Sequence, residues 1–142
     1  METMILPLRT GFEAFKLLPE GTLCQLINDA IIMSPASNTP HAIIQSKIFT
    51  LFYNYVEKND LGIAFCAPVD VYLDSRNIYQ PDIFFIGKER ADIVQERGIY
   101  GSPDLIIEIL STDRKYDMVI KKEVYEISAV NEYWVVDPAT KW

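Results

Sequence analysis

The chain has few of the residues that bind transition metals or form disulfides, with two cysteines and one histidine in 142 residues. Cys24 and Cys66 each lie in an apolar stretch without CxxC spacing, so we expect reduced core thiols rather than a disulfide or a zinc site. His41 has no second histidine or cysteine placed to share a metal. It is therefore either a hydrogen-bonded packing residue or, less often in such sequences, a ligand or catalytic group.

Long apolar runs are also missing. No stretch of about 18 apolar residues occurs, and residues 1–15 show no basic, apolar and small-residue leader. The sequence thus predicts neither a membrane span nor a secretory signal, and we expect a cytoplasmic protein. Because 49% of the residues are hydrophobic, the chain can form one buried hydrophobic core. We expect a single domain over residues 1–142, with residues 1–11 disordered.

Positive charge is scarce, since the formal net charge is −7. Phosphate neutralisation supplies most non-specific affinity for nucleic acids, so this balance excludes a protein that coats DNA by charge alone. Binding to DNA then requires bridging metal ions or a local basic patch. The candidates for such a patch are Lys88, Arg90, Arg97, Arg114, Lys115, Lys121 and Lys122. Solvated surface charges are the alternative interpretation.

Hydrophobic periodicity predicts a mixture of helices and strands. Spacings of three and four residues predict helices over 11–18, 40–58 and 115–127, with Thr39 as the N-cap of the second. Short apolar or alternating runs predict strands over 23–27, 30–33, 63–66, 69–73, 80–86, 104–110 and 131–136. Asn28 and Asp29 tolerate the positive φ angles of a tight hairpin between the first two strands. The fold class is α/β.

The run 104–110 is apolar on both faces of the predicted strand except for Asp104 and Glu108, which is typical of a central strand. Glu108 lies two residues before the strand ends. An unpaired ionised carboxylate is costly in an apolar wall, so Glu108 needs a partner. The helical stripe of the next segment directs Lys121 toward it. Glu108 and Lys121 form either a buried ion pair or half of a metal-and-lysine catalytic centre.

A second acid, Asp82, opens the preceding strand after Pro81. An acid after proline is often only a turn or strand-start residue. Asp82, Glu108 and Lys121 nevertheless have the types needed for metal-assisted phosphodiester hydrolysis. Two close carboxylates raise a pKa or recruit a divalent cation, and oxygen ligands suit Mg²⁺ or Mn²⁺. The lysine could then orient a water or stabilise charge on the phosphate.

Several segments together resemble a known family. They are Leu26-Ile27, Ile32-Met33-Ser34-Pro35-Ala36-Ser37, His41, Gln80-Pro81-Asp82, Ser102-Pro103-Asp104-Leu105-Ile106-Ile107-Glu108-Ile109-Leu110-Ser111, Asp117 with Lys121, and Glu132-Tyr133-Trp134-Val135-Val136-Asp137-Pro138. This combination is similar to the Uma-two family of bacterial proteins, which is assigned to the PD-(D/E)xK, restriction-endonuclease-like superfamily. The resemblance extends from about residue 12 to the end of the chain.

The resemblance implies a restriction-endonuclease-like α/β core, with a mixed sheet flanked by helices, and a metal-dependent endonuclease acting on DNA. Asp82 and Glu108 match the family's metal-binding acids, and the carbonyl of Ile109 matches the backbone ligand for Mg²⁺ or Mn²⁺. Lys121 matches the catalytic lysine in the variant that carries it on the following helix. Two further positions, Asp117 and Tyr125, match residues expected to support that helix.

Two departures from the family pattern leave an alternative open. Gln25 stands where the family usually has a glutamate, which should lower metal affinity. The resemblance also implies C-terminal strands that are missing after Trp142. An uncovered sheet edge invites pairing, so we expect a homodimer. The alternative is a catalytically degenerate nuclease-fold protein that serves as a binding or assembly module. Convergence of the acids and the lysine in a pocket open to solvent would favour the enzyme, whereas a Lys121 that points away or a Glu108 sealed under side chains would count against it.

Overall fold

The computed structural model describes residues 10–34, 36–111 and 115–139, with the side chains of 115–118 left out. Its helices are α1 (Gly11–Lys16), α2 (Thr39–Lys58), α3 (Lys115–Ile127) and the 3-10 helix η1 (Lys88–Ile93). Its strands are β1 (Cys24–Ile27), β2 (Ala30–Met33), β3 (Gly62–Cys66), β4 (Val71–Asp74), β5 (Asn77–Tyr79), β6 (Ile83–Gly87), β7 (Val94–Gln95), β8 (Gly98–Tyr100), β9 (Leu105–Ile109) and β10 (Glu132–Val136). The expected α/β class is confirmed.

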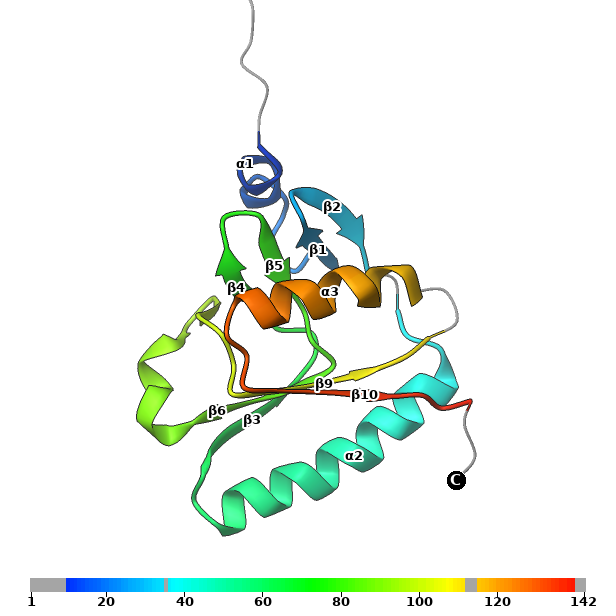
Figure 1. Ribbon diagram of the computed structural model, residues 1–142, viewed down its shortest axis with the longest axis vertical. Helices are drawn as coiled ribbons and strands as arrows, with labels where there is room; N and C mark the ends of the chain where they lie inside the picture. Colours follow the sequence, from blue (N-terminus) through cyan, green and yellow to red (C-terminus); the bar gives the residue numbers. More distant parts are fainter. Residues whose placement is uncertain (1–9, 35, 112–114, 140–142) are drawn as a thin grey trace, which may run out of the picture.

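The strands form two mixed sheets rather than the single sheet that we expected. One sheet has the order β10-β9-β6-β3, in which only β10 and β9 are parallel. The other has the order β2-β1-β5-β4-β8-β7, in which β4 and β8 are parallel. In Figure 1, α2 runs along one side of the four-stranded sheet, while α3 lies on the other side. The second sheet and α1 stand beyond α3.

Strand β9 is interior and buried along its whole length. Because side chains alternate along a strand, its two faces meet different partners. Leu105 and Ile107 pack with Ile83 toward the aromatic face of α2. On the opposite face, Ile106 joins a core that includes Tyr125 of α3. Glu108 shares the face of Ile106, so the alternation directs its carboxylate toward α3.

The larger core lies between the two sheets and includes α3. Val71 and Tyr79 come from the second sheet, and Phe84 and Ile86 come from β6. Tyr125 contacts this group from α3, with its ring 5.4 Å from that of Tyr79 in an edge-to-face arrangement. Helix α3 therefore packs against both sheets, and this packing fixes the position along β9 at which Lys121 makes its contact.

Several local predictions need correction. Asn38, not Thr39, caps α2, because its side chain accepts a hydrogen bond from the amide of His41 at 2.9 Å. Thr10 caps α1, and Gly11 begins it with its amide donating to Asp29, so the expected disorder of residues 1–11 is wrong at positions 10 and 11. Residues 1–9 lie outside the described part.

The predicted strand over 80–86 begins later, at Ile83, and a strand that the sequence did not predict, β5, precedes it. The segment 88–100, where the sequence predicted neither a helix nor a strand, holds η1, β7 and β8. The hairpin of β1 and β2 is confirmed, with φ of 50° at Asn28 and 71° at Asp29. Cys24 is buried and Cys66 is half-buried, and both are free thiols. Among the described residues, no helix combines the length and apolarity needed to cross a membrane.

The cap at Asn38 supports a first prediction. Replacing Asn38 with alanine removes the acceptor for the His41 amide, and loss of such a cap costs about 1 kcal/mol of unfolding free energy. Asn54→Ala, at an exposed position within α2, is the matched control and should be neutral or slightly stabilising. Urea denaturation monitored by circular dichroism measures both. Equal stabilities for the two variants would contradict the role of the cap.

Candidate active site

The pairing of β6 with β9 brings two acids together. Ile83 of β6 lies opposite Ile107 of β9 in an antiparallel register, so Asp82, one residue before, lies opposite Glu108, one residue after. Side chains of opposed residues project to the same face of a sheet. The two carboxyl groups are close enough to share a hydrogen bond. The register thus creates the site from two positions that are 26 residues apart in the chain.

Asp82 is held by three neighbours. Its Oδ2 accepts a hydrogen bond from the amide of Ile109 at 2.7 Å and lies 3.3 Å from Nε2 of His41. Its backbone carbonyl accepts from the side-chain amide of Gln45 at 3.0 Å. Burial alone would raise the pKa of Asp82, but the hydrogen bonds from His41 and Ile109, together with the charge of Lys121, hold that pKa below its usual value. Asp82 is therefore the ionised acid of the pair.

Glu108 has a different environment. Its Oε1 lies 3.4 Å from Nζ of Lys121 and accepts a hydrogen bond from the hydroxyl of Tyr125 at 2.9 Å. Burial raises the pKa of Glu108 to about 7; the charge of Lys121 opposes this shift, and the charge of Asp82 adds to it. The side chains of Glu108 and Lys121 are each 4% exposed. A proton and a cation can thus compete for the Glu108 carboxylate near neutral pH.

The donor set fits a hard divalent cation, although it is small. Two carboxylates in hydrogen-bond contact cannot both stay ionised at low cost without a cation or a proton between them. Magnesium is commonly bound by one or two carboxylates, with waters and substrate phosphates completing the shell. Among the described residues, no group of three His, Cys, Asp or Glu side chains is arranged to hold a metal. Coordination of an ion by Asp82 and Glu108 would therefore need further oxygen ligands that are not His, Cys, Asp or Glu side chains of the described residues.

The site reaches the surface on the Asp82 side. A hollow of about 200 Å³ is lined there by Gln25, Gln45, Gln80 and Asp82, together with residues of the loops before α2 and around Pro68. Glu108 and Lys121 do not line it and lie behind Asp82. The acids and the lysine therefore converge as the sequence predicted, but only Asp82 adjoins the opening. Lys121 thus points toward Glu108, but Glu108 is sealed under side chains, which counts against the enzyme interpretation.

Gln25 lines the same hollow and is fully engaged. Its Oε1 accepts a hydrogen bond from the backbone amide of Gln80 at 2.8 Å, and its Nε2 donates to the hydroxyl of Ser34 at 3.2 Å. A carboxylate at this position could accept from Gln80 but could not donate to Ser34 through the same atom. The amide thus serves as a structural link beside Asp82, as the default interpretation of a buried glutamine predicts.

The residues predicted to support the site are Tyr125, His41 and Asp117, and the first two contact its acids. Tyr125 contacts Glu108 directly rather than only stabilising α3. His41 is buried against Asp82. The side chain of Asp117 lies outside the described residues.

Sequence reasoning missed three other groups. Gln45, one helical turn after His41, holds the Asp82 carbonyl, and its i, i+4 spacing could have indicated this. Tyr79 places its ring 5.3 Å from the Lys121 ammonium. The Tyr133 hydroxyl is buried without a hydrogen-bond partner among the described residues, and the acids Glu108 and Asp82 raise its pKa after the larger effect of burial.

The proposed basic patch is only partly available. Lys121 is buried against Glu108, while Arg90 pairs with Asp104 at 3.1 Å and Lys88 with Asp60 at 3.4 Å. Arg97 and Lys122 are exposed. Arg114 and the side chain of Lys115 fall outside the described residues. Within this candidate patch, contact with a polyanion therefore relies on Arg97 and Lys122 among the described residues.

Comparisons with known proteins give a consistent picture. The profile of the Uma2 family, described as "Putative restriction endonuclease", matches residues 12–142. A crystal structure titled as a putative nuclease belonging to DUF820, from Anabaena variabilis, is similar in fold, with a TM-score of 0.76. The two chains are 25% identical, and the match covers 92% of this chain and 74% of the other. The search of curated proteins found no match.

The hydrogen bond between Tyr125 and Glu108 supports a second prediction. Tyr125→Phe removes a donor to a buried carboxyl group and should lower the unfolding free energy by about 1.5–3 kcal/mol. The control is Tyr55→Phe. Tyr55 is 61% exposed, so removing its hydroxyl should change the unfolding free energy little. Thermal and urea unfolding in EDTA measure both variants. A loss no larger for Tyr125→Phe than for Tyr55→Phe would show that the hydroxyl does not stabilise Glu108.

Proposed function

Because the chain belongs to the Uma2 family, which is described as "Putative restriction endonuclease", we propose that it is a divalent-metal-dependent endonuclease that hydrolyses DNA phosphodiester bonds. Family and fold support a nuclease-like protein. The observation that carries the finer proposal is the junction of β6 and β9, where the register sets Asp82 opposite Glu108 and Lys121 lies 3.4 Å from Glu108.

Asp82, Glu108 and the carbonyl of Ile109 are the proposed ligands of Mg²⁺ or Mn²⁺. When bound, such an ion polarises the phosphate and acidifies a water. Asp82 is prepared for this role because the Ile109 amide and His41 fix its carboxylate and keep it ionised. Glu108 is prepared through its raised pKa, which lets it exchange a proton for a cation near neutral pH.

Lys121 supplies the positive charge for the reaction in this proposal. Its ammonium is fixed between Glu108 and the ring of Tyr79, so it loses little conformational entropy when a phosphate approaches. A preorganised cation in a site of low dielectric constant stabilises developing negative charge more strongly than a solvated one. Lys121 would either orient the attacking water or hold the phosphate oxygen that gains charge.

The second candidate function is a nuclease-fold module that binds without cutting. The closed Glu108–Lys121 pair favours it, because each side chain is 4% exposed and neither lines the hollow beside Asp82. In that case the pair stabilises the core and the surface carries the function. The two candidates differ in whether a metal ion can reach Glu108.

A nicking assay separates the two candidates. Supercoiled plasmid is incubated with the protein at low salt, with Mn²⁺ or Mg²⁺ and with EDTA. We expect metal-dependent nicking that falls by about 100-fold or more in Glu108→Ala, because loss of a group that positions charge at the reacting centre has an effect of this order. Glu123→Ala changes an exposed acid on α3 and should retain activity.

Two results of this assay would contradict the nuclease proposal. Nicking of equal rate in the wild type and in Glu108→Ala would place the activity elsewhere. An absence of nicking by folded wild-type protein with either metal would favour the binding module. Isothermal titration of Mn²⁺ into the wild type and into Asp82→Asn shows independently whether the acids bind metal.

The free edge of β10 supports a proposal about assembly. Strand β10 pairs only with β9 among the described strands, and it exposes Trp134 at 50% and Val135 at 48%. Two copies can pair such edges around a twofold axis, and we propose a homodimer of this kind. Sedimentation velocity should show a dimer that Val135→Lys shifts toward monomer. A monomer at micromolar to millimolar concentration would exclude it.

A further inference from the structure

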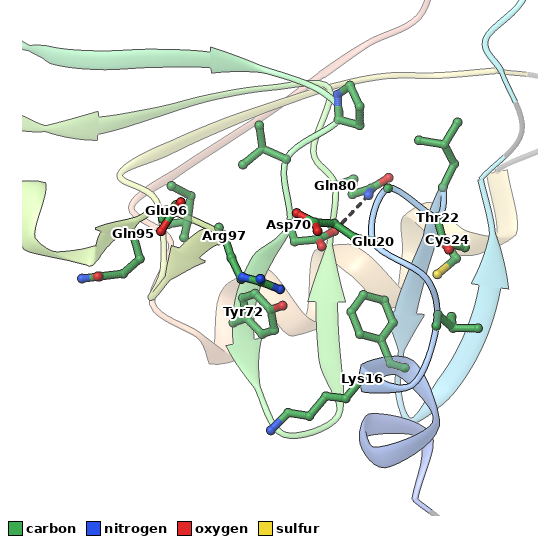
Figure 2. A pocket seen from close by; sticks show the side chains of 18 of the residues that line it. Lys16, Glu20, Thr22, Cys24, Asp70, Tyr72, Gln80, Gln95, Glu96 and Arg97 are labelled. Carbon is green, nitrogen blue, oxygen red and sulfur yellow. Dashed lines mark hydrogen bonds between the residues drawn. The ribbon is translucent and has the colours of Figure 1, made fainter.

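A groove of about 750 Å³ lies on the second sheet, outside the group of acids already described. It is bordered by the loop after α1, by β4 and by the β7–β8 hairpin. Figure 2 shows Asp70 and Gln80 near its centre, with Tyr72 and Arg97 on one side and Thr22 and Cys24 on the other. Its volume lies in the range of pockets that bind small organic ligands.

The centre of the groove presents hydrogen-bond acceptors. Oδ1 of Asp70 accepts from Nε2 of Gln80 at 2.9 Å, as drawn in Figure 2. No other side-chain hydrogen bond of Asp70 occurs among the described residues, so its second oxygen is available. The two oxygens of this one carboxylate are adjacent acceptors, and Gln80, which donates through its nitrogen, keeps its own Oε1 as a further acceptor in the groove wall. The centre thus suits a ligand edge with two adjacent N–H donors.

Aromatic rings line the same groove. The ring of Tyr72 stacks on Tyr100 with centroids 4.5 Å apart and an angle of 3°, and the ring of Phe65 stacks on Phe84 at 4.8 Å. Tyr72 and Phe65 both line the groove. Each ring is fixed by its stacking partner, so little entropy is lost when a flat ligand packs against it. A planar, donor-bearing group fits these walls.

The groove is a neighbour of the hollow beside Asp82. The two share Leu23, Pro68 and Gln80 in their walls. Gln80 precedes Asp82 by two residues, which span about 7 Å of extended chain. The backbone amide of Gln80 is held by Gln25, which lines the hollow. A ligand in the groove therefore lies roughly one nucleotide away from the acid that adjoins the opening.

We propose that this groove binds an unpaired guanine base of the nucleic-acid substrate, with Asp70 and Gln80 reading its Watson–Crick edge. The inference rests on the proposed nuclease function. Guanine is the base that presents a ring N–H and an amino group side by side on that edge, whereas adenine and cytosine offer only an amino group. Enzymes that read a base in this way extrude it or act on single strands, and they combine edge contacts with stacking.

The charges around the groove agree with recognition of a base rather than of phosphates. Lys16 and Arg97 line it together with Glu20, Asp70 and Glu96, so acidic side chains outnumber basic ones. Phosphate attraction is therefore weak here, and affinity must come from stacking and from the base edge. Burial raises the pKa of the Asp70 carboxyl, while the hydrogen bond from Gln80 lowers it.

The test measures binding in EDTA, so that it does not depend on cleavage. The probes are short fluorescein-labelled oligothymidylates with one central base, which is guanine, hypoxanthine, 7-deazaguanine or adenine. Hypoxanthine lacks the amino group, whereas 7-deazaguanine keeps the whole Watson–Crick edge. We expect guanine and 7-deazaguanine to bind alike and both to bind about tenfold tighter than hypoxanthine or adenine, the discrimination typical of a bidentate contact.

Matched variants locate the contact. Asp70→Asn should abolish the preference for guanine over hypoxanthine, because an amide places a donor where the base needs an acceptor. Asp92→Asn makes the same change in charge at an exposed position of η1 and should keep the preference. Tyr72→Leu should weaken binding of all probes by about tenfold without changing their order, as expected for lost stacking. Thermal melting confirms that each variant is folded.

Two outcomes overturn the inference. Equal binding of guanine and hypoxanthine probes by the wild type, or a preference that survives in Asp70→Asn, removes the base-reading role. Displacement of the probes by arginine amide, without base preference, would assign the groove to a cationic side chain instead. If the protein nicks plasmid but its binding shows no preference for guanine probes, only the guanine inference is refuted. If it prefers guanine probes but does not nick plasmid, the nuclease proposal is refuted and the guanine site remains.

Discussion

The site depends on the antiparallel pairing of β6 with β9, which places Asp82 opposite Glu108 inside the protein. Two carboxyl groups at this distance in a medium of low dielectric constant repel when both are ionised. The neighbouring residues compensate in different ways for each acid. Asp82 receives the Ile109 amide and His41, whereas Glu108 receives Tyr125 and Lys121. The donors to Asp82 outweigh its burial and lower its pKa, whereas the burial of Glu108 outweighs Lys121 and Tyr125 and raises its pKa.

The same contacts explain why the site is only partly open. Each donor that stabilises Glu108 also covers it, so the pair of Glu108 and Lys121 is almost completely buried. Asp82 keeps access to solvent because Gln25 and Gln80 form a hollow beside it rather than a lid. Glu108 is thus enclosed by the residues that contact it, whereas Asp82 borders the hollow. A cation must enter from the Asp82 side.

The sequence allowed the main elements to be predicted where the pattern was strong. Strand β9 and helix α3 agree with the predictions within a residue or so, because a continuous apolar run and a helical stripe are local signals. The approach of Lys121 to Glu108 followed from the same stripe. The division into two sheets, strand β5 and the contact of Gln45 with Asp82 were missed. These features depend on pairing between distant segments, which a single sequence does not encode in its periodicity.

The position of α3 between β9 and β10 also constrains how the protein folds. These two strands are parallel, so the chain must cross over through α3 before β10 can pair. Until α3 docks, Glu108 lacks both Lys121 and Tyr125 and sits in an apolar wall without compensation. A chain interrupted before α3 therefore carries both acids without the lysine.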